Sequence, residues 1–132
     1  MSNEVLEGYL NKLERGFERS EDGTYLVSAG THRPPIALRV AQPVLVAQVD
    51  VGPAPDDDAP TEAKLFRHLL ELNASDLLHS AYALENGRIV LTAALELANM
   101  DLNEFEAILA DMDLALAEHV PGLKTMVEGK ES

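Results

Sequence analysis

The sequence predicts an α+β domain in which three helices pack on an antiparallel five-stranded sheet, in the chain order α-β-β-β-α-β-β-α. Three stretches repeat apolar residues at spacings of three and four, which is typical of amphipathic helices. Five shorter stretches are rich in β-branched residues, and Asn86-Gly87 joins two of them as a hairpin. The length of 132 residues fits one domain, which we assign to residues 1–132.

The first helix is expected over residues 3–18. Its apolar face consists of residues spaced by one, three and four: Val5, Leu6, Tyr9, Leu10, Leu13 and Phe17. Ser2 or Asn3 can cap its start, and Glu21-Asp22-Gly23 breaks the pattern after its end.

Three strands are expected next, over residues 24–29, 36–41 and 44–51. Pro34 and Pro35 lie in the connection before the second strand, because proline cannot donate to a sheet ladder. The third strand is apolar on both faces for much of its length, which is typical of strands covered on both sides.

The stretch from Gly52 to Pro60 reads as a surface loop, because it holds three prolines and the acidic run Asp56-Asp57-Asp58. It leads into a helix that begins near Pro60 or Thr61, where proline and acidic residues are favourable. The buried side of this helix is expected to hold Leu65, Phe66, Leu69 and Leu70, and Asn73 can end it.

The hairpin from Ala81 to Ala93 is the strongest local signal. A type I′ turn needs positive φ at both central residues, so Asn86 and Gly87 fix the register and place Glu85 opposite Arg88. Alternation then assigns the larger residues to a core face: Tyr82, Leu84, Ile89 and Leu91. The opposite face is flat, small and half polar: Ala81, Ala83, Val90 and Thr92.

The last strand is expected to continue to Leu97, and a third helix follows it. Asp101 and Glu104 have the spacing of a capping box. The buried stripe of this helix repeats at three and four: Leu102, Phe105, Leu109, Met112 and Leu116. Pro121-Gly122 is expected to end the helix.

Composition narrows the class of function. The chain has 23 acidic and 10 basic residues, and its formal net charge is −13. Such a field repels phosphate backbones, so we expect no direct binding to nucleic acid. Without cysteine, disulfides and thiol catalysis are excluded. We expect a cytoplasmic protein without membrane contact, because no apolar run approaches ~20 residues and the first residues lack a secretory pattern.

The sequence contains no recognisable catalytic motif. Four histidines are scattered without a helical metal-binding pair: His32, His68, His79 and His119. The run Asp56-Asp57-Asp58 lacks the alternation and the glycine of a calcium loop, so it reads as a solvated loop. We therefore expect no metal, no cofactor and no enzymatic activity. A metal-dependent hydrolase that uses clustered carboxylates is the alternative, since spacing in sequence does not give spacing in space.

The second half of the chain resembles the YbjN family, which shares the fold of type III secretion (Tir) chaperones. The residues that carry the resemblance are Leu-Leu-Glu-Leu-Asn from Leu69, the hairpin Glu-Asn-Gly-Arg-Ile-Val-Leu from Glu85, and Leu-Glu-Leu-Ala-Asn-Met-Asp-Leu-Asn-Glu-Phe from Leu95. The resemblance covers roughly residues 60–120. It implies a small acidic protein, usually a homodimer, that binds another protein as a chaperone, adaptor or regulator and catalyses nothing.

The small-residue face of the hairpin is our candidate for the binding site: Ala81, Ala83, Val90 and Thr92. Small side chains allow a second backbone to approach closely, and a flat apolar strip beside charges is typical of a protein-binding patch. Acidic residues of the last helix would steer a basic partner: Asp101, Glu104 and Asp111. The same face could instead form a homodimer contact, because the helices cover one sheet face well and the other only partly.

Overall fold

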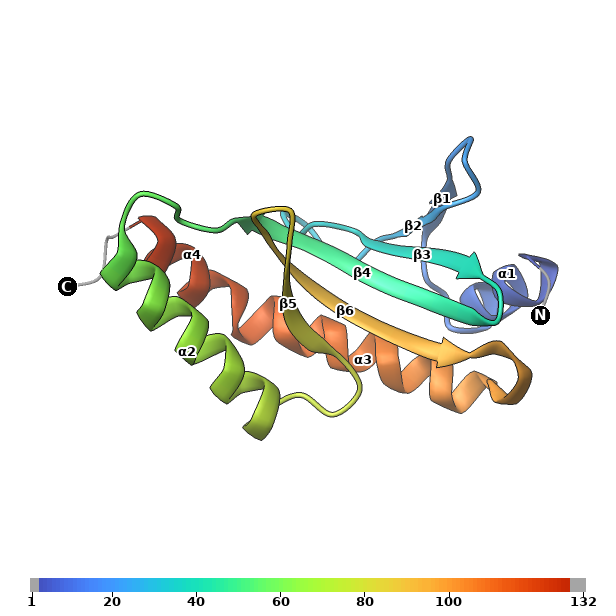
Figure 1. Ribbon diagram of the computed structural model, residues 1–132. Coiled ribbons are helices and arrows are strands. Elements are labelled where there is room, and N and C mark those ends of the chain that lie inside the picture. The colour runs from blue at the N-terminus through green and yellow to red at the C-terminus, as the bar shows by residue number, and fades with distance from the viewer. Residues whose placement is uncertain (1–2, 129–132) are drawn as a thin grey trace.

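The computed structural model describes residues 3–128. The protein is a twisted sheet with its helices on one side (Figure 1). The helices are α1 (Asn3–Lys12), α2 (Ala59–Ser75), α3 (Leu102–Glu118) and α4 (Val120–Glu128). The strands are β1 (Phe17–Arg19), β2 (Tyr25–Val27), β3 (Ile36–Ala41), β4 (Val44–Pro53), β5 (Ala81–Glu85) and β6 (Arg88–Glu96). A short 3-10 turn, Leu97–Asn99, joins β6 to α3.

All neighbouring strands pair antiparallel, in the spatial order β1-β2-β3-β4-β6-β5. The long pair β4 and β6 forms the middle of the sheet and runs from the pair Val44 and Glu96 to the pair Pro53 and Arg88. A bulge between Asp50 and Gly52 shifts the register near the end of β4. Helix α2 separates β4 from β5 in the chain. The hairpin then pairs β5 with the outer side of β6, so β5 is an edge strand of the sheet.

The α+β class and the antiparallel sheet are confirmed, but the expected counts are wrong. The described residues form six strands and four helices, whereas we expected five strands and three helices. The additional strand is β1 and the additional helix is α4. Each arises where a chain segment that looked like the end of a helix adopts a structure of its own.

The first helix ends at Lys12 and does not reach residue 18. Glu14 adopts a positive φ of 55°, and the N–H of Arg15 donates to the carbonyl of Leu10 at 2.9 Å, which closes the helix end. Phe17 then begins β1 and pairs with Val27. The helical spacing of Phe17 was therefore misleading, because its burial comes from the sheet.

Pro121 and Gly122 do not end the helical region. Helix α3 ends at Glu118, His119 caps it, and α4 begins at Val120. Proline is favourable in the first turn of a helix, where an N–H would lack a helical partner anyway. Here Pro121 occupies the first turn of α4, so it marks a start and not a stop.

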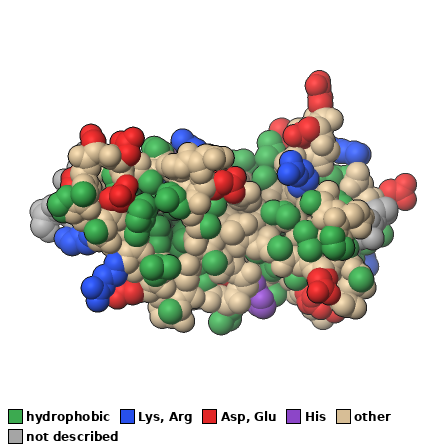
Figure 2. Space-filling model, in the orientation of Figure 1, with side chains coloured by type: hydrophobic (Ala, Val, Ile, Leu, Met, Phe, Trp, Pro, Cys, Tyr) green, Lys and Arg blue, Asp and Glu red, His purple; other side chains and the backbone are tan. Residues whose placement is uncertain are grey.

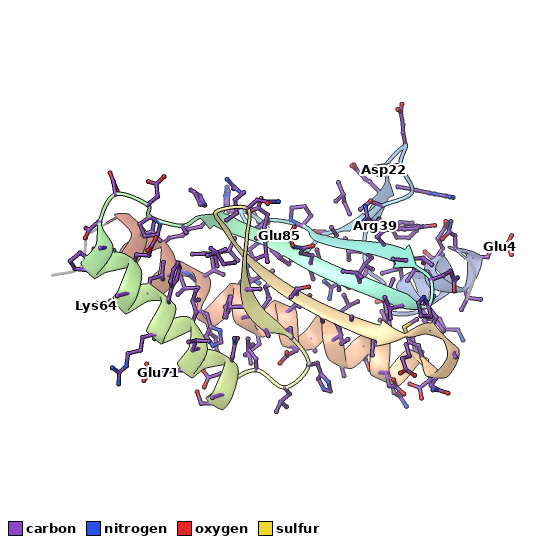
Figure 3. All side chains as sticks on the ribbon, in the orientation of Figure 1. Glu4, Asp22, Arg39, Lys64, Glu71 and Glu85 are labelled. Carbon is purple, nitrogen blue, oxygen red and sulfur yellow. The ribbon has the colours of Figure 1, made fainter. Side chains whose placement is uncertain are left out.

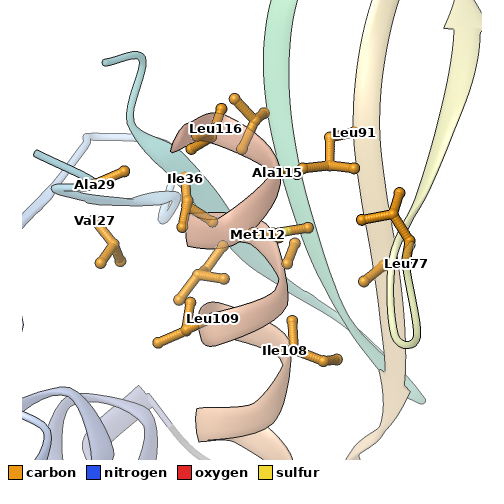
Figure 4. Close-up of a cluster of buried hydrophobic side chains, with 14 of the residues drawn as sticks. Val27, Ala29, Ile36, Leu77, Leu91, Ile108, Leu109, Met112, Ala115 and Leu116 are labelled. Carbon is orange, nitrogen blue, oxygen red and sulfur yellow. The ribbon is translucent and has the colours of Figure 1, made fainter. Parts of the chain in front are cut away.

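The core lies between the sheet and the helices (Figure 4). Inward-facing side chains of the central strands, such as Leu45, Val49 and Leu91, are at most 3% exposed. They join the apolar stripe of α3, whose Met112 and Ala115 are fully buried. The close-up shows Leu91 of β6 beside this stripe. Burial of these leucines contributes roughly 1.5–3 kcal/mol per side chain to folding.

The hairpin register is confirmed. Asn86 and Gly87 have φ of 52° and 77°, and Glu85 pairs with Arg88. The expected core face is confirmed for Tyr82, Ile89 and Leu91 but wrong for Leu84, which is 55% exposed. Leu84 lies on the edge strand near the turn, where the strand has a neighbour on one side only.

Candidate protein-binding surface

The face of the sheet opposite the core carries no helix in the described residues (Figure 1). Its central rows follow from the strand register. Arg39 on β3 pairs with Val46 on β4, which pairs with Ala94 on β6. The next row contains Ala37, Gln48, Thr92 and Ala81. Val46 and Thr92 are half-buried and Ala94 is exposed, so β4 is not covered on both sides as its sequence predicted.

The four predicted site residues share this outer face, but they are not equally accessible. Ala83 is exposed, and Ala81 and Thr92 are half-buried. Val90 is only 5% exposed, so a partner cannot contact it without displacing other side chains. The candidate site is therefore smaller at the turn end of the hairpin than the sequence predicted.

Polar side chains from neighbouring strands explain the burial of Val90. Val90 lies between Asp50 on β4 and Ala83 on β5 in the register. Arg88 Nε donates to both carboxylate oxygens of Asp50, at 3.0 and 2.8 Å. Gln48 Nε2 donates to Glu85 Oε2 at 3.2 Å. These pairs occupy the outer face around Val90, and the open part of the face begins at Thr92.

The open part of the outer face also contains Val46 and Ala94, which were not among the predicted site residues. The signal was available in two places. The second apolar face of β4 was visible in the run from Val44 to Val49, and the alternation of β6 continues from Thr92 to Ala94. What the sequence did not contain was the register of β4 against β6, which brings these residues together.

Only two of the three residues of the predicted acidic rim lie at the surface. Asp101 is the N-cap of α3 and accepts a hydrogen bond from the N–H of Glu104 at 2.8 Å, while both side chains are exposed. Asp111 is buried, with 8% of its surface exposed, so its assignment to a surface rim is wrong. Its position on α3 directs it toward the loop between α2 and β5.

The carboxylate of Asp111 holds that loop through four hydrogen bonds. It accepts the backbone N–H groups of Leu78 (3.3 Å), His79 (3.0 Å) and Ser80 (2.9 Å), and the Ser80 hydroxyl at 2.6 Å. Desolvation by burial raises the pKa of Asp111, but these hydrogen bonds outweigh it, so the pKa lies below its ordinary value. Asp111 is therefore an ionised structural anchor.

A second buried network adjoins this anchor. His119 Nδ1 lies 3.0 Å from the hydroxyl of Tyr82, and its Nε2 lies 3.0 Å from Asp76 Oδ2. The side-chain amide of Asn73 accepts from the Tyr82 N–H at 2.7 Å and donates to the Tyr82 carbonyl at 3.2 Å. This amide occupies the place of a neighbouring strand at the free edge of β5.

The order Asp76, His119, Tyr82 has the form of a catalytic relay, but its geometry does not expose a reacting atom. Tyr82 is 6% exposed, and burial raises the pKa of its hydroxyl far above the ordinary value. A protonated, buried phenol is neither a nucleophile nor a base for an external substrate. The network instead ties α2, β5 and the junction of α3 with α4 together.

A groove lies between α2 and β5 on the flank of the molecule, where Figure 2 shows hydrophobic side chains gathered. Its volume is about 160 Å³, and its lining includes Phe66, Leu69 and Ala83. Two of its leucines are largely exposed, Leu70 at 68% and Leu84 at 55%. Leu78, on the loop that Asp111 anchors, is 84% exposed. Exposed leucines beside a groove are typical of a protein contact.

Metal and membrane sites receive no support from the described residues. Within residues 3–128, no group of three or more acidic or histidine side chains could hold a metal ion. The Asp58 carboxylate accepts from the N–H of Thr61 at 3.1 Å and from its hydroxyl at 2.7 Å, so it caps α2. No helix in this part of the chain is long and apolar enough to cross a membrane.

The described residues thus form a small α+β domain whose antiparallel sheet is covered by helices on one side and has an open, partly apolar face on the other. The CesT_Tir_1 family profile, which describes type III secretion chaperones, matches residues 1–129. The chain therefore belongs to the CesT_Tir_1 family. No curated protein sequence matches the chain.

Solved structures share this fold. A chain of the ExoU–SpcU complex from the Pseudomonas aeruginosa type III secretion system superposes with a TM-score of 0.70 at 18% identity, covering 92% of this chain and 97% of its own. YbjN from E. coli gives 0.65 at 12% identity, covering 98% and 92%. A chain of the HopA1–SchA chaperone–effector complex gives 0.60 at 14% identity, covering 92% and 91%. The resemblance to YbjN and to secretion chaperones that the sequence indicated is confirmed.

Proposed function

We propose that this protein is a non-enzymatic, cytoplasmic binding module that acts as a chaperone or adaptor for another protein. The observation that carries the proposal is the open outer face of the sheet, which no helix within residues 3–128 covers and which exposes small and apolar side chains around Val46, Thr92 and Ala94. Membership of a secretion-chaperone family supports it. So does the likeness to structures of chaperone complexes, including SycH with a fragment of YscM2.

The proposed client surface keeps most of the residues chosen from the sequence. Ala81, Ala83 and Thr92 remain in it, Val90 drops out because it is buried among polar side chains on the same face, and the surface extends along β6 to Ala94. Small side chains on neighbouring strands leave a flat area onto which another chain can lie. Asp101 and Glu104 are exposed near the end of β6 and would favour a client that carries basic residues.

A matched pair of arginine variants tests this surface. Ala94→Arg places a long charged side chain in the middle of the outer face, whereas Ala98→Arg makes the same change at an exposed position in the 3-10 turn. A client identified by pull-down with the wild-type protein should be lost by the first variant and retained by the second, with both folded by circular dichroism. Equal binding by the two variants would show that the client docks elsewhere.

We further propose that the protein is a homodimer and that the α2–β5 flank is its contact. The flank places two exposed leucines, Leu70 and Leu84, at a groove that can receive an apolar side chain. Leu78 supplies a third leucine on a loop that is held rigidly by Asp111. A surface that carries both projecting leucines and a receiving groove can be self-complementary about a twofold axis.

The charges of α2 support an antiparallel arrangement of two copies. Lys64 lies in the first half of the helix, Arg67 at its midpoint and Glu71 in the second half; Figure 3 marks Lys64 and Glu71. All three side chains are exposed, and Arg67 lies 3.9 Å from Glu71 in its own helix. Antiparallel α2 helices would bring Lys64 toward the partner's Glu71, whereas a parallel pair would align like charges.

Leu70→Asp tests the dimer, with Leu114→Asp as the control at an exposed leucine of α3. Sedimentation equilibrium of the wild-type protein and of the control should give twice the chain mass of 14.3 kDa at micromolar concentration. Leu70→Asp should give the single-chain mass. A wild-type protein that sediments at the single-chain mass would refute the dimer, and a dimeric Leu70→Asp would refute this contact.

A further inference from the structure

A second hollow lies at the end of the sheet, away from the client face. Its lining shares Ile89 with the groove of the α2–β5 flank. It has a volume of about 240 Å³ and lies between the end of β4 and helix α4. Its walls are apolar and come from three elements: Val51 and Pro53 of β4, Ile89 of β6, and Leu123 and Val127 of α4. Leu123 and Ile89 are at most 2% exposed, so the floor belongs to the rigid core.

The β-bulge of β4 accounts for this hollow. The register shifts between Asp50 and Gly52, and Gly52 has a φ of 151°, a conformation that favours glycine. Apart from its chain neighbours Val51 and Pro53, no atom of the described residues lies within 4 Å of the position that a Cβ at Gly52 would take. After the bulge, Gly52 and Pro53 still pair with Ile89 and Arg88 of β6, and the open space beside Gly52 is not filled by core side chains.

Among the residues that the structure describes, Lys124 is the one charged residue in the lining of this hollow. Lys124 is an exposed residue of α4 and follows the buried Leu123 in the chain. A site with apolar walls and a single ammonium group at its edge complements a ligand with an apolar body and one negative charge. The volume is below the roughly 300–1,000 Å³ of sites for drug-sized ligands, so one unbranched chain suits it better than a ring system.

We propose that this hollow binds a medium-chain aliphatic carboxylate, with the chain among Val51, Ile89 and Val127 and the carboxylate at Lys124. A polyanion is a poor candidate because the net charge of −13 repels it, whereas one carboxylate experiences much less repulsion. Lys124 and the apolar walls then divide the recognition. The chain supplies affinity through burial, and the ammonium group selects the acid over an uncharged analogue.

The first test is a chain-length series. Hexanoate, octanoate and decanoate, each below its micellar concentration, should bind with affinity that rises about fourfold per added methylene until the hollow is full. Isothermal titration calorimetry measures the affinity, and methyl NMR of Ile89, Leu123 and Val127 locates it. No saturable binding, affinity independent of chain length, or shifts spread over the outer face instead of these methyl groups would overturn the proposal.

The second test separates the charge from the apolar walls. Lys124→Gln should weaken octanoate binding about two- to fivefold, the size expected of an exposed ion pair, and should leave octanol binding unchanged. Lys12→Gln is the matched control, because Lys12 is an exposed lysine of α1 outside the lining. Val127→Glu should abolish binding of the acid. Equal affinity in the two glutamine variants would refute the role of Lys124, and full binding by Val127→Glu would refute the site.

Discussion

Replacing Asp111 with asparagine should destabilise the protein by about 2–4 kcal/mol, because the carboxylate holds the loop between α2 and β5. Three of its four hydrogen bonds have lengths of 2.6–3.0 Å and join one oxygen, Oδ2, to His79 and Ser80. A hydrogen bond to a charged group contributes roughly 1.5–3 kcal/mol, against about 1 kcal/mol for a neutral one. Asparagine keeps one acceptor oxygen but turns an NH₂ group either toward the N–H of Leu78 or toward the N–H groups of His79 and Ser80.

Urea unfolding measures this loss. With a slope of about 2 kcal/mol per molar urea, the middle of the range for a small domain, the midpoint should fall by about 1–2 M. Asp57→Asn is the control, because Asp57 is an exposed loop residue whose substitution should change stability by no more than about 0.5 kcal/mol. An Asp111→Asn variant as stable as this control would refute the anchoring role.

The pH dependence provides an independent check. The pKa of Asp111 is lower in the folded protein than its ordinary value, so its contribution is fully present above the unfolded pKa of about 3.9. The contribution is lost as the pH falls through the folded pKa. The stability difference between wild type and Asp111→Asn should therefore be constant from pH 5 to 7 and shrink below about pH 4. A difference that stays constant to pH 2.5 would contradict this.

The remaining predictions concern the buried network and the backbone. Tyr82→Phe should lower the free energy of unfolding by about 1–3 kcal/mol, because it removes the hydroxyl that lies 3.0 Å from the buried Nδ1 of His119. Thermal unfolding at pH 8 measures this loss, with Tyr9→Phe as the control. An equal loss in the two variants would argue against the network. Gly87→Ala should destabilise by about 1–2 kcal/mol since φ is 77°, whereas Gly8→Ala in α1 should stabilise by about 0.5–1 kcal/mol. Urea unfolding distinguishes the signs, and equal effects at the two glycines would contradict the reasoning.

The outer face shows how far the sequence alone could locate the candidate site. Alternation along the hairpin placed Ala81, Ala83 and Thr92 on one face correctly, because the turn at Asn86-Gly87 fixes the register locally. The accessibility of Val90 was not predictable in this way. It depends on Arg88 reaching Asp50, a residue 38 positions away that only the pairing of β4 with β6 brings near.

Asp111 on α3 is a second residue whose environment could not be predicted from the sequence nearby. Its charge and its neighbours Glu106 and Asp113 made it look like part of a solvated acidic face. The loop of residues 78–80 packs against it, and the backbone N–H groups of that loop donate to its carboxylate. No residue close to it in sequence carries that information.

The sequence by itself determined the α+β class, the family resemblance, the hairpin register and the start of α3 at Asp101. Each of these depends on signals that act over a few residues: turn conformation, capping and apolar periodicity. Only the tertiary structure decided that Phe17 belongs to a strand, that Leu84 is exposed and that Asp111 is buried. Burial and pairing depend on which distant segments pack together, because the energy of a side chain is set by neighbours that the local sequence does not specify.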